Sequence, residues 1–292
     1  RWWAADLQHG DGGQHCQQEA ILRPIHRKLH GTEHSPIVPG AHLLFNVLNC
    51  DDATLVNQTH GLLEAAVETR VPVFLGWDPQ VWWDQRPDLW NHWNKSAPGY
   101  DPSNRENVEW TSWSEESALK ISWLNWGRQI RMPPAQNIHA PRVRAATAHA
   151  LRVVGRVVGA WWAGANVEDR ALLAGIKLGC EASIGWQTWA YPDANLIFDK
   201  WPHDDQHDPT YGGNHSAPPE PPTFGHAQIG FAAATTSSLK SAGPLTNHDV
   251  QTLTHWYLAN LTAAVIEVGV PKSVLFTHYG GTLIPAGASP VA

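Results

Sequence analysis

Residues 41–77, AHLLFNVLNCDDATLVNQTHGLLEAAVETRVPVFLGW, decide the predicted fold because they combine a strand, a helix and a second strand. The flanking runs, 41–49 and 71–77, are almost continuously apolar, which is typical of parallel strands that are covered on both faces. Between them, Asp51 and Asp52 offer N-caps to a segment whose apolar side chains recur at helical spacing. A strand–helix–strand unit with short connections predicts an α/β fold.

The same alternation of helix and strand recurs later in the chain. Apolar residues at helical spacing predict helices over 142–164 and 249–270, and apolar runs predict strands over 172–180 and 272–281. A further helix is expected over 114–131, where acidic residues occupy the first turn and arginines the last, as the helix dipole favours. These elements extend the α/β pattern across most of the chain.

The chain is expected to contain one domain preceded by an arm. Residues 1–40 are polar and rich in His and Gly, and they are interpreted as an irregular N-terminal arm. Residues 41–292 are predicted to form a single α/β domain with two long loops, 78–106 and 186–226, of the kind that often serve as binding loops. Residues 107–113, NVEWTSW, could add a short strand after the first loop.

The length of 292 residues suits a (β/α)8, TIM-barrel-like fold, which typically takes about 250 residues. The sequence shows clear signals for four strands rather than eight. Three explanations remain open: further strands are hidden in the loops, the domain is incomplete at the C-terminus, or the sheet is open.

The composition favours a folded protein and excludes some partners. Apolar residues make up 42% of the chain and charged residues 16%, which is enough for a sizeable core. The formal charge of −7 argues against nucleic acid as a partner, since such proteins normally carry a basic patch. We expect no membrane span, because the apolar runs do not reach the roughly 20 residues that a span requires.

N-glycosylation patterns favour a secreted glycoprotein. The three cysteines allow at most one internal disulfide, which leaves the redox compartment open. The chain begins at Arg1 without a Met, which fits a processed protein and equally a fragment of a longer one. Four positions match the N-glycosylation pattern: Asn57, Asn94, Asn214 and Asn260.

Polar or ionisable residues beside aromatic ones follow three of the predicted strands. Asp78 follows Trp77 at the end of one strand. Glu181 precedes Trp186 after the next, and His278 stands beside Tyr279 at the end of the last. In α/β sheets, ligands bind outside the carboxyl ends of parallel strands. The sequence therefore predicts a binding site at this edge of the sheet.

Tryptophan suggests the chemical class of the ligand. The chain has 17 Trp, and flat aromatic rings cover the apolar face of a sugar while carboxylates and amides bind its hydroxyl rim. The alternative is that Trp simply fills the core, which is the preferred interpretation for the helical Trp161 and Trp162. The aromatic residues expected to contact carbohydrate are Trp77, Trp82, Trp83, Trp186, Trp189, Tyr191 and Tyr279, together with His278.

Glu181 has two interpretations. A glutamate at a strand end can be paired structurally with an arginine or with backbone N–H groups. Its apolar neighbours would instead raise its pKa by desolvation, as a general acid at neutral pH requires. Glycoside hydrolysis needs a second carboxylate, about 5 Å away in retaining enzymes and further away in inverting ones. The candidates are Asp78, Glu109 or a residue beyond residue 292.

With its strand-end Glu181 and Trp-rich loops, the chain resembles the TIM-barrel glycoside hydrolases of the large retaining superfamily. The resemblance covers roughly residues 41–282 and implies that Glu181 corresponds to the acid/base at the end of the fourth strand. The family usually has Asn before that Glu, where this chain has Cys180, and a glutamate at the end of the seventh strand has no clear counterpart here.

Other chemistries are less well supported. The His- and Asp-rich segment 203–215 has no metal-binding spacing and is interpreted as a solvated loop, so neither a metal nor a cofactor is predicted. The favoured hypothesis is a glycoside hydrolase of an extracellular or cell-wall glycan that uses carboxylate acid/base catalysis. The alternative is a catalytically inactive barrel that serves as a secreted carbohydrate-binding or structural assembly protein. The sequence does not predict the oligomeric state.

Overall fold

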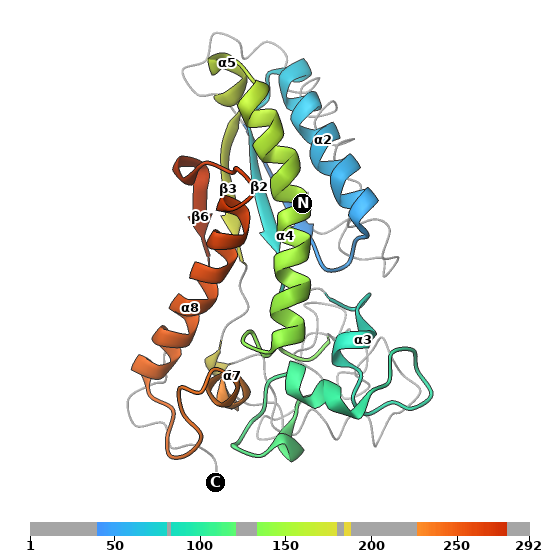
Figure 1. Cartoon of the computed structure of the whole chain (residues 1–292), viewed down its shortest axis with the longest axis vertical. Helices are drawn as coiled ribbons and strands as arrows, with labels where there is room; N and C mark the ends of the chain where they lie inside the picture. The colour runs from blue at the N-terminus through green and yellow to red at the C-terminus, as the bar shows by residue number, and fades with distance from the viewer. Residues whose placement is uncertain (1–39, 81–82, 121–132, 180–183, 188–226, 279–292) are drawn as a thin grey trace, which may run out of the picture. The chain divides into compact units, whose positions relative to one another are not determined.

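The computed structural model describes residues 40–80, 83–120, 133–179, 184–187 and 227–278 (Figure 1). The chain divides into two compact units, which are described separately. The first unit takes its residues from Arg1–Gln80, Ala146–Cys180 and Leu258–His278, and the second from Val81–Ala145, Glu181–Tyr257 and Tyr279–Ala292. The predicted N-terminal arm and most of the predicted loop 186–226 lie outside the described residues.

The first unit is built on a four-stranded parallel sheet, which confirms the predicted α/β class. Its strands are β1 (Ala41–Asn46), β2 (Val73–Asp78), β3 (Leu173–Leu178) and β6 (Leu275–Thr277). They lie side by side in the order β1-β2-β3-β6, and every neighbouring pair is parallel. The four clearly signalled strands are therefore present, and strands that are consecutive among these four in the chain are neighbours in the sheet.

Helices follow the strands as predicted. The first unit contains α2 (Asp52–Thr69), α5 (Val167–Arg170) and the short 3-10 helix η6 (Lys272–Val274). It also contains most of α4 (Pro141–Gly164) and the last part of α8 (Asn247–Ile266). The N-cap prediction for α2 is confirmed, since the Asp51 carboxylate accepts a hydrogen bond from the Thr54 N–H at 2.7 Å.

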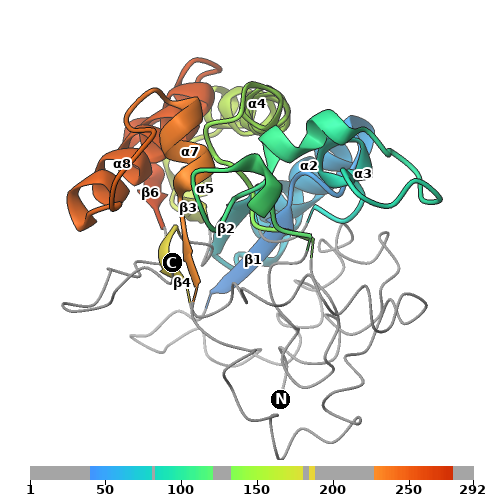
Figure 2. The same cartoon turned by 90° about the horizontal axis from the view of Figure 1, so that it is seen from below.

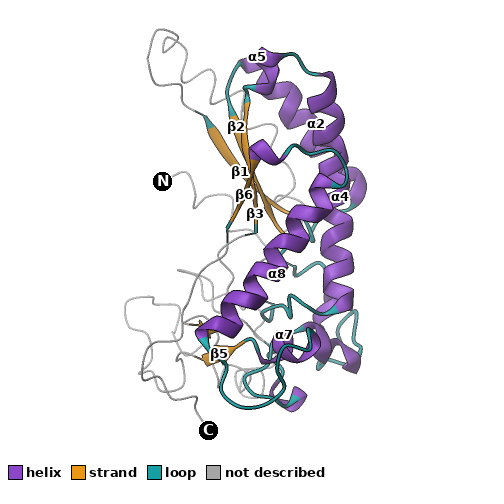
Figure 3. Ribbon diagram, turned by 60° about the vertical axis from the view of Figure 1, so that its left-hand side comes forward, coloured by secondary structure: helices purple, strands orange, loops and turns teal. Residues whose placement is uncertain are grey.

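The two faces of this sheet differ in their environment. Figure 3 shows the described helices of the first unit on one side of the strands. Leu75, Trp77 and Ile176 belong to the face beneath them and are fully buried. On the opposite face, Phe74 contacts His42 and Phe276, with ring centroids 5.4 and 5.5 Å apart. Burial alternates over the first residues of β1, whereas the last residues of β1 and β2 are buried on both faces of the sheet.

The second unit is built from shorter elements: α3 (Pro87–Trp90), η3 (Pro102–Asn107), η4 (Glu115–Ser117), β4 (Gly185–Gln187), β5 (Ala227–Ile229) and α7 (Phe231–Thr236). β4 and β5 pair in antiparallel orientation, and β4 is labelled in Figure 2. None of the helices in the described ranges is long and apolar enough to cross a membrane.

The helix predicted over 114–131 is wrong at its start. Glu115–Ser117 form only a 3-10 turn, and Ala118 then makes an isolated β-bridge with Trp110. The cause is local, because the hydroxyl of Ser114 accepts from the Glu116 N–H and that of Ser117 donates to the Ser114 carbonyl. Such side-chain bonds compete with helical ones. Residues 121–132 lie outside the described residues.

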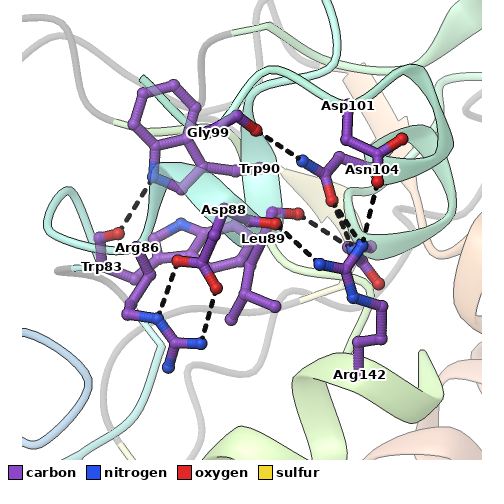
Figure 4. Close-up of polar contacts among 10 residues, drawn as sticks. Trp83, Arg86, Asp88, Leu89, Trp90, Gly99, Asp101, Asn104 and Arg142 are labelled. Carbon is purple, nitrogen blue, oxygen red and sulfur yellow. Dashed lines mark hydrogen bonds and ion pairs between the residues drawn. The ribbon is translucent and has the colours of Figure 1, made fainter.

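The segment 107–113 also differs from the prediction. Its residues Val108 and Trp110 form isolated bridges with Gln136 and Ala118 instead of a regular strand. Side-chain amides and two arginines, Arg86 and Arg142, hold the preceding loop (Figure 4). Arg142 donates to the Asn104 amide oxygen and to the Asp88 carbonyl, both at 2.9 Å.

A close contact in the first unit depends on two glycines of α4. A Cβ at Gly159 would lie 2.6 Å from the Val268 carbonyl oxygen, and one at Gly155 would lie 2.7 Å from a Val268 methyl carbon. These distances are shorter than van der Waals contact, so α4 can approach Val268 this closely only where it carries no side chain.

We predict that Gly159→Ala lowers the free energy of unfolding by about 1–3 kcal/mol, because the added methyl group overpacks this contact. Gly164→Ala is the matched control in the same helix, since no atom lies within 4 Å of a Cβ there. Urea unfolding monitored by circular dichroism measures both variants. Equal effects of the two substitutions would contradict the proposed packing.

Candidate functional site

The candidate site is a row of residues at the carboxyl edge of the parallel sheet. Asn46 and Asp78 are register partners at the ends of β1 and β2. The preceding row pairs Trp77 with Leu178. The ladder then continues, because the Gly179 N–H donates to the Trp77 carbonyl at 3.1 Å and the His278 N–H to the Leu178 carbonyl at 2.9 Å. Asn46, Asp78, Gly179 and His278 thus form one row across four strands, which we call the edge row.

Gly179 allows the edge row to close. Its φ of +87° lies in the left-handed region that favours glycine. A Cβ at this position would collide with the His278 carbonyl oxygen, and it would lie 3.8 Å from the Gln80 side-chain oxygen. The Gly179 backbone therefore approaches both the end of β6 and the residues that follow β2, where a side chain would separate them.

The edge row and the nearby Gln80 contain buried polar groups. Asn46 is 3% exposed, Asp78 is fully buried and Gln80 is 4% exposed. One oxygen of the Asp78 carboxylate accepts a hydrogen bond from the Gln80 N–H at 2.8 Å. The side-chain oxygens of Asn46 and Gln80 and the Nδ1 atom of His278 are buried and have no hydrogen-bond partner among the described residues. Leaving such a group unpaired costs about 1–3 kcal/mol, and a hydrogen-bond donor from outside the described residues would relieve this cost.

A histidine and a lysine lie on the same face of the sheet as the edge row. His42 and Lys177 belong to rows further from the carboxyl edge, on the face opposite the helices. Burial lowers the pKa of His42, and the positive charge of Lys177 lowers it further. Both effects favour the neutral form of His42 at physiological pH.

The structure brings together two of the predicted site residues, Asp78 and His278. Trp77 is fully buried beneath the helices of the first unit. Trp83 belongs to the second unit, is also fully buried, and donates its Nε1–H to the Pro134 carbonyl at 3.0 Å. Both have the burial of core side chains. The predicted residues Glu181, Trp82, Trp189, Tyr191 and Tyr279 and the side chain of Trp186 lie outside the described residues.

Glu109 has a different environment in the second unit. Its carboxylate is fully buried and accepts hydrogen bonds from the Gly230 N–H at 2.8 Å and the Ala233 N–H at 3.3 Å. These N–H groups belong to the beginning of α7, so Glu109 caps that helix from a distant part of the chain. Burial raises the pKa of Glu109 to about 8, although the backbone N–H groups around it act in the opposite direction. This geometry favours a structural role for Glu109.

Sequence reasoning missed three members of the site: Asn46, Gln80 and Gly179. Asn46 carried a usable signal, because it ends the apolar run LLF in the same way that Asp78 ends its strand. Gly179 had no comparable signal, since its role depends on the approach of β6, which comes almost 100 residues later in the chain.

The remaining predictions concern glycosylation, disulfides and metal sites. Of the predicted glycosylation positions, Asn57, Asn94 and Asn260 are exposed, and Asn214 lies outside the described residues. Cys50 is disulfide-bonded. No group of three or more His, Cys, Asp or Glu side chains within the described ranges is arranged to hold a metal ion.

Comparison with protein-family models, with curated proteins and with solved structures found no match to the chain. The chemical interpretation of the edge row therefore depends on its geometry.

We predict that Gly179→Ala destabilises the protein more than Gly243→Ala does. Both glycines have positive φ, +87° and +75°, so both substitutions incur the left-handed backbone penalty of about 1–2 kcal/mol. Gly243 has open space around its Cβ position, whereas Gly179 faces the His278 carbonyl. The difference between the melting temperatures of the two variants measures the effect of the collision with the His278 carbonyl. Equal losses would show that the edge row tolerates a side chain.

A second prediction concerns pH. The folded-state pKa of Glu109 is about 8, above its ordinary 4.5, so its contribution to stability is complete below pH 4.5 and is lost as the pH rises through 8. Glu109→Gln should remove this dependence, which has a limiting slope of about 1.4 kcal/mol per pH unit. Urea unfolding at pH 5, 6, 7 and 8 measures the slope.

The control for this experiment is Glu116→Gln, which removes an exposed carboxylate that pairs with Arg105 at 3.1 Å. It should leave the slope unchanged. A wild-type slope that persists in Glu109→Gln would contradict the assignment of a buried, protonated Glu109.

Proposed function

We propose that the chain is a glycoside hydrolase that acts on an extracellular or cell-wall glycan, with its active site at the carboxyl edge of the parallel sheet. The observation that carries this proposal is the edge row, in which buried polar groups from three strands meet beside Gly179. Glu181 follows Gly179 by two residues in the sequence. A sugar ring offers the hydroxyl groups that such a site can bind.

The proposed roles follow from the chemistry of each group. The side-chain oxygens of Asn46 and Gln80 accept hydrogen bonds from sugar hydroxyls, and His278 orients the ring through its Nδ1 atom. Glu181 donates a proton to the leaving oxygen, as general acid catalysis at a glycosidic bond requires. Asp78 is the better supported second carboxylate, because both oxygens of Glu109 already accept hydrogen bonds from α7.

We propose a TIM-barrel-like architecture for the domain. In a (β/α)8 barrel, parallel strands are neighbours in chain order and the helices lie outside. Doubly wound sheets instead reverse the strand order and carry helices on both faces. The order β1-β2-β3-β6, with the helices that the structure describes in the first unit on one face, supports the barrel-like alternative.

The alternative function is a catalytically inactive barrel that binds carbohydrate or assembles into an extracellular structure. The complete burial of Asp78 favours this possibility, since a catalytic carboxylate has to reach its substrate. Under either function the protein is proposed to be secreted. The exposed Asn57, Asn94 and Asn260 and the disulfide-bonded Cys50 support that location.

The test of the hydrolase proposal compares purified wild type with Asp78→Asn and Glu181→Gln on a panel of aryl glycosides and soluble cell-wall polysaccharides. Both substitutions preserve shape and remove a carboxylate. Each should lower kcat/KM by about 10²–10⁴, the usual contribution of acid–base catalysis. Glu64→Gln, an exposed carboxylate on α2, is the control and should leave kcat/KM unchanged.

Two results would contradict the proposal. Hydrolysis that survives in both Asp78→Asn and Glu181→Gln would place the active site elsewhere. Binding of a polysaccharide without hydrolysis by wild type would favour the inactive carbohydrate-binding protein.

A further inference from the structure

The sequon at Asn94 differs in its surroundings from the other two that the structure describes. Asn57 lies inside α2 and Asn260 inside α8. Asn94 lies in an irregular segment between α3 and η3, where Asn94, Lys95 and Ser96 are all exposed. The residues before it include two tryptophans, so a glycan at this position would begin beside aromatic side chains.

The backbone of Asn94 is held on both sides by the Asn91 side chain. The Asn94 N–H donates to the Asn91 amide oxygen at 2.9 Å, and the Asn91 amide nitrogen donates to the Asn94 carbonyl at 3.0 Å. The Ala97 N–H also donates to this carbonyl, at 3.2 Å. Asn91 itself is fully buried. Asn94 is therefore an exposed residue on a fixed turn.

The Asn94 side chain uses only one of its two polar ends. Its oxygen accepts a hydrogen bond from the Ser96 N–H at 3.0 Å. Its nitrogen, Nδ2, makes no hydrogen bond to any residue that the structure describes. An N-glycan is attached to Nδ2, so a glycan at Asn94 would not break any described contact.

Trp90 and Trp93 form an aromatic pair next to this turn. Their ring centroids are 5.5 Å apart at an interplanar angle of 31°, and His92 meets Trp93 edge-on at 5.0 Å. The pair is anchored, because Trp90 Nε1–H donates to the Trp83 carbonyl at 3.0 Å (Figure 4). Both tryptophans are only partly buried. Part of each side chain is therefore exposed, and Trp93 directly precedes Asn94 in the chain.

We propose that Asn94 carries an N-glycan and that its first N-acetylglucosamine packs on the Trp90–Trp93 pair. In the transfer step, Nδ2 forms a bond to the anomeric carbon of a lipid pyrophosphate-linked oligosaccharide. The bond from that carbon to the pyrophosphate oxygen breaks, the lipid pyrophosphate leaves with the electron pair, and Nδ2 loses one proton. The packed sugar shields the indole rings from water and stabilises the turn.

This inference rests on the secretory location in the proposed function and is independent of the hydrolase chemistry. The test therefore expresses the full chain through a eukaryotic secretory pathway and compares wild type with Ser96→Ala and Ser96→Thr. Ser96→Ala destroys the sequon and keeps the backbone N–H that bonds Asn94, whereas Ser96→Thr preserves both. Peptide mass spectrometry should find sugar at Asn94 in wild type and Ser96→Thr, and none in Ser96→Ala.

Two physical measurements test the packing. The melting temperature of secreted Ser96→Ala should be about 2–4 °C below that of wild type. The same two proteins made in bacteria, which lack the glycan, should have equal melting temperatures. Glycans trimmed to a single N-acetylglucosamine should give one acetyl methyl proton signal that is shifted upfield by the indole rings and is missing from Ser96→Ala. In Trp93→Ala the melting difference and the upfield shift should both disappear.

An unmodified Asn94 in a secreted protein whose other sequons carry sugar would overturn the modification site. A modified Asn94 whose acetyl methyl signal stays at the position of a free glycan would overturn the packing. The methyl signal is read in the wild-type chain, so this second result does not depend on whether Trp93→Ala folds.

Discussion

The close approach of the Gly179 backbone to the end of β6 is the constraint on which the candidate site depends. Parallel pairing brings Asn46, Asp78, Gly179 and His278 into one row, and a side chain at Gly179 would collide with the His278 carbonyl. The row contains buried polar groups that the described residues leave unpaired. Hydrogen-bond donors from outside the described residues can pair with these groups, and sugar hydroxyl groups are the donors that the proposed function would supply.

Among the described residues, two acidic side chains, Asp78 and Glu109, are fully buried in different surroundings. Asp78 ends a strand and accepts a hydrogen bond from Gln80, only two residues later. Glu109 instead receives N–H groups from α7, more than 100 residues later in the chain. The first lies where ligands bind in parallel α/β sheets, and the second connects distant segments of its own unit. Position in the fold, rather than burial, therefore distinguishes a candidate catalytic group from a structural one.

The sequence predicted the four strands of the sheet and helices α2, α4 and α8, because their apolar periodicity is strong. It failed near Glu115, where serine hydroxyl groups bond the local backbone and replace a helix with a 3-10 turn. It identified Asp78 and His278 as strand-end groups, but the role of Gly179 depends on tertiary contacts that no local pattern records. The cap formed by Glu109 was missed for the same reason, since its partners lie in another part of the chain.

Hydrogen–deuterium exchange in the presence of soluble cell-wall oligosaccharides tests the location of the site most directly. An oligosaccharide that binds should slow exchange in the peptides around Asn46, Asp78 and His278. Exchange in α7, whose first N–H groups are held by Glu109, should stay unchanged. Slowed exchange confined to the second unit, with these strand-end peptides unaffected, would contradict a binding site at the edge row.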